Sequence, residues 1–180
     1  RLYGGSFARL GSFYPLLAWN SREGWETDPP SAFGWETWTS PTADFDVRVT
    51  APPGMRVVAT GERVGPGHWR AERVRDFALA AGRFLVASGT ASAPKPVHLT
   101  VAVASGSQSL ARRILVDARN ALQAHSQRFG PYPWTTFTTF ASHTGPFSFE
   151  YPTLVFLSSD ESDSASGLAH EIGHQWFYSL

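Results

Sequence analysis

Residues 168–177 read LAHEIGHQWF, and this stretch determines how the rest of the chain is interpreted. On a helix, residues four positions apart lie on the same face, so His170 and His174 can both reach one metal ion. Glu171 would then lie beside that ion, where a carboxylate can take a proton from a water molecule at the metal. The stretch therefore predicts a zinc helix in which His170 and His174 are ligands and Glu171 is the general base.

The same ten residues also predict how this helix is anchored. Leu168, Ile172 and Trp176 recur at every fourth position, which is typical of a buried apolar stripe. His170 lies two positions after Leu168, about 200° further round a helix that turns ~100° per residue. We therefore expect the stripe to pack into the core and the histidines to face elsewhere.

The third zinc ligand has to come from outside this motif, because a catalytic zinc usually has three protein ligands and one water. In one class of zinc peptidases a glycine follows the second histidine after three residues, and a third histidine follows after three more. Phe177 and Leu180 occupy those positions here, which excludes that class. The remaining main option is a glutamate from a later helix, and we expect that glutamate beyond Leu180.

Composition limits the possible partners and compartments. The 180-residue chain is 42% hydrophobic and 17% charged, which is enough apolar material for a core and is not typical of disorder. Its 15 basic and 15 acidic residues cancel, so nothing favours binding to nucleic acid or an anionic membrane. It has no cysteine, which excludes disulfides and thiolate metal sites, and it has no stretch of the ~20 apolar residues that a transmembrane helix needs. Because the chain begins with Arg1 and ends inside an expected helix, we expect it to be a piece of a longer protein.

The first hundred residues are expected to form β-structure. Phe45, Val47 and Val49 alternate with polar residues, which is the period of a half-buried strand. Further strands are expected at 55–61, 68–74, 77–81, 83–88 and 97–103. Short strands separated by glycine and proline predict an antiparallel sandwich or saddle-shaped sheet, which we assign to an N-terminal β-domain over residues 1–104.

The pattern changes near Ser105. Residues 109–129 have apolar side chains at helical spacing, and the sequence Gly130-Pro131 ends that helix. Strands are expected at 136–141 and 151–157, and the zinc helix follows. This order predicts an α+β chain in which residues 105–180 begin a second, α/β catalytic domain.

Several segments together resemble the M1 aminopeptidases, a gluzincin family that includes leukotriene A4 hydrolase. The zinc helix at 168–177 is similar to theirs, and the other matching segments, in the family's order, are 13–18 with Gly24-Trp25, 43–47, 76–80, 129–134 and Glu150-Tyr151-Pro152. The last of these matches the end of the family's G-G-M-E-Y-P motif. The resemblance implies a thermolysin-like catalytic domain, a bound Zn²⁺ and hydrolysis of peptides that have a free N-terminus.

The resemblance also implies roles for single residues. His170 and His174 would be the zinc ligands, Glu171 the general base, and Glu150 the group that binds the α-amine of the substrate. Where the family has Gly-Gly-Met, this chain has Phe147-Ser148-Phe149. Because glycine lets a substrate backbone lie close to the strand, we expect the bulkier residues to narrow or redirect that subsite.

Other candidates receive a structural interpretation. His143 is expected to be an exposed loop residue, and Asp160, Glu161 and Asp163 to be solvated or helix-capping acids rather than substitute ligands.

The parent protein is accordingly expected to be a zinc aminopeptidase, and this piece alone to be inactive because two histidines hold zinc weakly. The alternative is an M1-like binding or scaffold module without catalysis, although the presence of Glu171 argues against it.

Overall fold

The structure is a computed structural model, and it describes residues 2–4, 7–17, 19–22, 24–25, 27, 41–104, 107–143, 148–158, 165–177 and 179. The expected cap of the zinc helix and the acids at 160, 161 and 163 lie outside these residues. No helix in the described part of the chain is long and apolar enough to cross a membrane.

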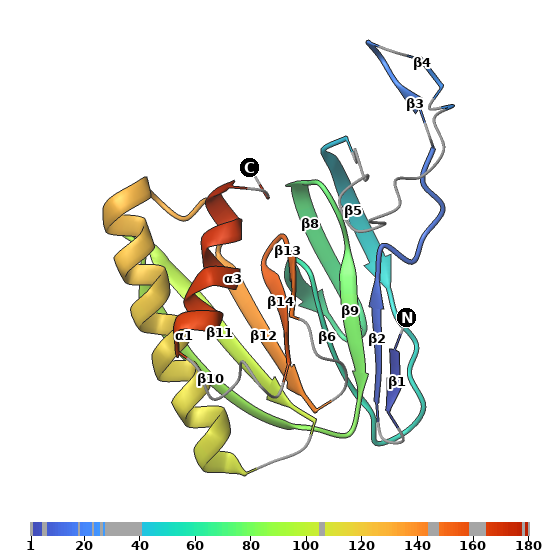
Figure 1. Ribbon diagram of the computed structural model, residues 1–180. Coiled ribbons are helices and arrows are strands. Elements are labelled where there is room, and N and C mark those ends of the chain that lie inside the picture. Colours follow the sequence, from blue (N-terminus) through green and yellow to red (C-terminus); the bar gives the residue numbers. More distant parts are fainter. Residues whose placement is uncertain are drawn as a thin grey trace.

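A five-stranded mixed sheet forms the centre of the fold (Figure 1). Its strands, in spatial order, are β10 (Leu85–Ser92), β11 (Pro96–Val103), β12 (Thr136–Ser142), β14 (Leu154–Ser158) and β13 (Phe149–Tyr151). The central pairs β11–β12 and β12–β14 are parallel, and the two outer pairs are antiparallel. A parallel pair needs a long crossover, and the helix α1 (Gln108–Phe129) supplies it between β11 and β12.

Smaller antiparallel sheets lie on the other side of the central sheet from the helices (Figure 1). One sheet has the order β1 (Leu2–Gly4), β2 (Phe7–Gly11), β9 (Ala78–Gly82) and β6 (Arg56–Ala59), and another has the order β5 (Ala43–Arg48), β8 (His68–Val74) and β7 (Glu62–Gly65). The short hairpin of β3 (Trp19–Asn20) and β4 (Gly24–Trp25) projects from the body with exposed tryptophans. The α+β fold class and the antiparallel β-region expected from the sequence are confirmed.

The main core lies between the central sheet and its two helices, α1 and α3 (Ala165–Phe177). Alternate residues of β11 such as Leu99 and Val101 face Ile114 and Leu122 of α1, which is why that helix shows the apolar spacing seen in the sequence. The other face of the sheet packs against the four-stranded sheet through Phe140, Phe156 and their neighbours. Strands β11 and β12, which come before and after residue 104 in the sequence, pair in the central sheet. The predicted domain boundary at residue 104 therefore falls between two strands of one sheet.

The prediction of a single strand over residues 151–157 is wrong. The structure has two strands, β13 and β14, joined by a tight turn at Pro152-Thr153 in which Tyr151 pairs with Leu154. Pro152 has no N–H to continue a ladder, and Thr153 has a φ of 63°, which no regular strand allows. The apolar run that suggested one strand is therefore a hairpin, and this turn positions Glu150.

Candidate active site

The zinc helix α3 is anchored by the apolar stripe that the sequence predicts. Leu168, Ile172 and Trp176 are 2%, 0% and 9% exposed. The indole N–H of Trp176 donates a hydrogen bond to the carbonyl of Gly130 over 3.1 Å. Gly130 adopts a φ of 104° at the end of α1, a conformation that favours glycine. Because Trp176 bonds to Gly130, the turn after α1 forms part of the surface against which α3 packs.

Two further residues fix the helix from the side of α1 and β12. The Nε2 atom of His125 lies 2.8 Å from the carbonyl oxygen of Ala169, and since a carbonyl only accepts, the ring nitrogen donates. Tyr132 packs against Trp176 and donates its hydroxyl to the carbonyl of Thr136 over 2.9 Å. Burial raises the pKa of Tyr132 well above its ordinary value of 10.0, so this donor stays protonated. His125 is thus a structural residue that helps to hold α3 in place.

The other face of α3 presents the residues that the motif predicts. His170 is exposed and His174 is half-buried, while Glu171 is 7% exposed. The two histidine rings face each other with their Nε2 atoms 3.3 Å apart. A carboxylate thus lies in the protein beside a pair of imidazoles that open to solvent.

The histidine pair has the spacing that a zinc ion requires. Zinc binds imidazole nitrogens at about 2.0–2.1 Å in tetrahedral geometry, which places two such nitrogens about 3.3–3.4 Å apart. The observed Nε2–Nε2 distance of 3.3 Å agrees with that value. The residues present therefore fit zinc in both donor type and spacing.

Glu150 joins this group from a different element. It lies in β13, the edge strand of the central sheet, and it is half-buried. One ligand atom each from Glu150, Glu171 and His174 lie within 4.8 Å of one another. The hairpin and the helix thus bring together residues more than twenty positions apart in sequence, with His170 in contact with His174.

The sequence predicts that the bulky residues before Glu150 narrow or redirect the substrate subsite, but the structure places Phe149 against the core. Phe149 and Tyr151 pack against the core cluster on the far side of the sheet, since neighbouring residues of a strand point to opposite faces. The hydroxyl of Ser148 accepts a hydrogen bond from the N–H of Ser158. Phe147 lies outside the described residues. Among the described replacements, Phe149 is therefore a packing residue.

One buried residue near the site was not recognised from the sequence. Gln175 is 0% exposed, and its amide bonds to both ends of the β13–β14 turn. A signal was present, because Gln175 lies seven residues after Leu168 on the apolar stripe, where a polar side chain needs a buried partner. His143, by contrast, is exposed, as expected.

No protein-family model and no curated protein matches the chain. Among solved structures, an aminopeptidase N family protein from Idiomarina loihiensis superimposes with a TM-score of 0.58 at 16% identity, over 77% of this chain and 28% of that one. An M1 zinc metallopeptidase from Deinococcus radiodurans gives a TM-score of 0.57 at 22% identity, over 78% of this chain and 35% of that one.

A third similar structure is a two-domain M1 zinc metallopeptidase variant bound to L-arginine, with a TM-score of 0.57 at 22% identity, over 78% of this chain and 35% of that one. The described part of the chain thus has the fold of M1 zinc metallopeptidases, as the sequence resemblance implied. The chain spans about a third of the length of these solved structures, between 28% and 35%.

Proposed function

We propose that this chain supplies the zinc helix and the amine-binding strand of a zinc-dependent aminopeptidase. His170 and His174 hold the zinc ion, together with a glutamate that we expect after Leu180. The observation that carries the proposal is the 3.3 Å spacing of the two Nε2 atoms, with Glu150 and Glu171 gathered around His174 within 4.8 Å. The shared fold with zinc metallopeptidases supports it.

The chemistry divides between the ion and the carboxylates. When bound, zinc polarises a carbonyl and lowers the pKa of water. Glu171 accepts the proton of the attacking water and passes it to the leaving amine. Because Glu171 is only 7% exposed, its charge acts in a medium less polar than water, where electrostatic interactions are stronger.

The position of Glu150 favours cleavage of the first peptide bond. A carboxylate binds a free ammonium group by a charge-assisted hydrogen bond. Within one residue the amine nitrogen and the carbonyl carbon are about 2.5 Å apart, from standard bond lengths and the angle at Cα. Because a carboxylate oxygen of Glu150 lies within 4.8 Å of one of Glu171, Glu150 can hold the amine of the residue whose carbonyl is attacked. A substrate with further residues before that amine would not fit between the two carboxylates.

The test uses a protein that contains this chain together with the sequence that follows it. We expect it to cleave a peptide with a free N-terminus and to leave the N-acetylated form of the same peptide intact. Glu171→Gln should retain zinc but lose at least about 100-fold in turnover, the range of general acid–base catalysis. Glu72→Gln, an exposed change on β8, is the matched control and should keep full turnover.

Glu150→Gln should raise KM for the free peptide, because a neutral amide pairs less well with an ammonium group. Equal cleavage of the free and acetylated peptides would contradict the role of Glu150. Tight peptide binding without any cleavage by zinc-loaded protein would instead indicate a non-catalytic binding module.

A further inference from the structure

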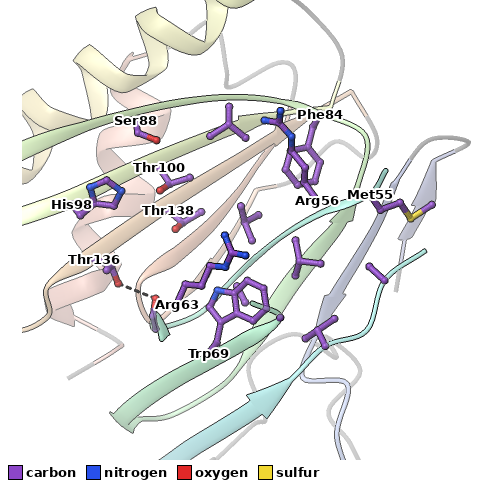
Figure 2. A pocket seen from close by; sticks show the side chains of 18 residues that line it. Met55, Arg56, Arg63, Trp69, Phe84, Ser88, His98, Thr100, Thr136 and Thr138 are labelled. Carbon is purple, nitrogen blue, oxygen red and sulfur yellow. Dashed lines mark hydrogen bonds between the residues drawn. The ribbon is translucent and has the colours of Figure 1, made fainter. Parts of the chain in front are cut away.

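A cavity lies on the face of the central sheet that points away from α1 and α3. Its volume is about 650 Å³, within the range of roughly 300–1,000 Å³ that small-molecule pockets occupy. One wall consists of β10, β11 and β12, and the opposite wall comes from the segment around β6, β7 and β8 (Figure 2). The zinc helix packs on the other face of the same sheet, so this cavity is separate from the candidate active site.

The sheet wall of this cavity carries a row of hydroxyl groups. Ser88, Thr100 and Thr138 are direct cross-strand neighbours on β10, β11 and β12. Figure 2 shows their side chains on one wall of the pocket, next to His98. Among the described residues, none of these hydroxyls has a hydrogen-bond partner in the protein. Three donors in a row thus remain available to a ligand.

The rest of this face of the central sheet packs against the four-stranded sheet. Further along the strands, Ala102 and Phe140 are fully buried against Phe7 and Ala80 of the four-stranded sheet. The face is therefore apolar where the sheets touch, and where they separate it carries hydroxyl groups beside Phe84 and Val86.

Two arginines line the opposite wall. Arg63 pairs across the strands with Trp69, and its guanidinium group lies 5.8 Å from the centre of the indole ring. Its Nε donates to the carbonyl of Gly65 over 3.2 Å, which orients the terminal nitrogens. Arg56 also lines the pocket and has no ion-pair partner among the described residues.

Carboxylates are absent from the described lining of this cavity, whereas the outer face of the same three-stranded sheet carries several, among them Asp46 and Glu62. There Asp46 binds Arg70 at 2.8 Å and His68 at 2.7 Å. Two cations of the outer face, Arg70 and His68, are thus paired with a carboxylate, whereas Arg56 and Arg63 have no ion pair among the described residues. The described lining of the cavity therefore contains two arginines and no carboxylate, a composition that favours anions.

We propose that this cavity binds a small molecule that carries a phosphoryl or carboxylate group. The two arginines hold its anionic oxygens, since a guanidinium group matches such oxygens in charge and in the fork of its donors. The hydroxyl row and His98 hydrogen-bond the polar part of the ligand, and Trp69 and Phe84 contact its apolar part. The inference is independent of the proposed peptidase activity.

The test is isothermal titration calorimetry of the metal-free protein with inorganic phosphate and, separately, with acetate. Removing metal keeps phosphate from binding at a zinc ion. We expect saturable binding of at least one anion, and Arg63→Gln and Arg56→Gln should each weaken it about 10-fold, as expected for the loss of a charge-assisted hydrogen bond. Arg48→Gln is the matched control, because it removes the same charge from the outer face of the same sheet and should change the affinity less than about twofold.

A second variant avoids charge altogether. Thr138→Val keeps the shape of the side chain and removes one hydroxyl of the row, so it should weaken anion binding severalfold without lowering the melting temperature. Stronger binding of phosphate than of acetate would assign a phosphoryl ligand, and the reverse order would assign a carboxylate. Binding that falls equally in Arg48→Gln and Arg63→Gln, or no saturable binding of either anion, would overturn the proposal.

Discussion

Gln175 accepts a hydrogen bond from the backbone N–H of Thr153 over 2.8 Å, and this contact joins the zinc helix to the turn beside Glu150. The same side chain donates its amide N–H to the carbonyl of Tyr151 over 3.0 Å. One fully buried amide thus satisfies both backbone groups of the turn between β13 and β14. Because Glu150 immediately precedes Tyr151, this clamp sets the distance between Glu150 and the zinc helix.

We expect Gln175→Met to destabilise the protein by about 3 kcal/mol, because it leaves the buried N–H of Thr153 and the part-buried carbonyl of Tyr151 unsatisfied at about 1–3 kcal/mol each. The measurement is the free energy of unfolding from urea denaturation. Gln127→Met, an exposed change on α1, is the control and should stay within about 0.5 kcal/mol of the unmodified chain. A Gln175→Met protein as stable as this control would show that the clamp is not needed.

Thr153 connects the same turn to a second region. Its hydroxyl accepts a hydrogen bond from the N–H of Gly61 over 2.7 Å, at the start of β7. Thr153→Val keeps the branched shape but leaves that N–H without its partner, so we expect a loss of about 1–2 kcal/mol in unfolding free energy. Thr153→Ser keeps the hydroxyl and should lose less. If both variants unfold at the same urea concentration, the hydrogen bond makes no net contribution.

Zinc retention tests the histidine pair directly. After dialysis against metal-free buffer, we expect His170→Ala and His174→Ala to hold less zinc than the unmodified chain, since each removes a ligand. His98→Ala removes an exposed histidine on the other face of the central sheet and should have no effect. The content is measured by atomic emission of the protein at known concentration. An equal loss in His98→Ala would indicate adventitious surface binding.

The zinc content of the unmodified chain is informative as well. With two histidines as the only ligands, we expect well under one zinc per chain. Close to one zinc would mean that a third ligand lies within these residues or in a second copy. Glu150 is then the first residue to test, because its carboxylate lies within 4.8 Å of a ligand atom of His174. In that case Glu150→Gln should release the metal.

Asp46 is expected to make stability depend on acid pH. Hydrogen bonds from Arg70 and then His68 hold the pKa of Asp46 below its ordinary value of 3.8. A carboxyl group whose pKa is lower in the folded state stabilises that state above its unfolded pKa, and the contribution is lost as pH falls through the folded value. The melting temperatures of the unmodified protein and of Asp46→Asn should therefore differ at pH 6, begin to converge as the pH falls below about 4, and meet only below the lowered pKa of the folded state.

Glu72→Gln is the control for this series, because Glu72 is exposed on the same strand. The difference in melting temperature between Glu72→Gln and the unmodified protein should stay nearly constant from pH 6 to below about pH 4. A constant difference for Asp46→Asn as well would mean that the ion pair with Arg70 does not contribute, as is common for exposed pairs.

Elements with a clear period were predicted well from the sequence. The strand expected at 68–74 is β8, and the helix expected at 109–129 is α1, which begins one residue earlier. Both predictions follow from local periodicity, because the spacing of apolar residues indicates which face of an element is buried. The hairpin at Pro152-Thr153 was not predicted, because its turn depends on hydrogen bonds from Gln175 and Gly61, which are distant in sequence.

The sequence by itself determined the spacing of His170, Glu171 and His174, since a helix places such residues together whatever surrounds it. It also determined the buried stripe that anchors this helix. Only the tertiary structure decided that Glu150 lies within 4.8 Å of Glu171 and His174, and that Arg63 and a row of hydroxyls line the same cavity. Those relationships join residues that no local period connects, so they depend on how sheets and helices pack.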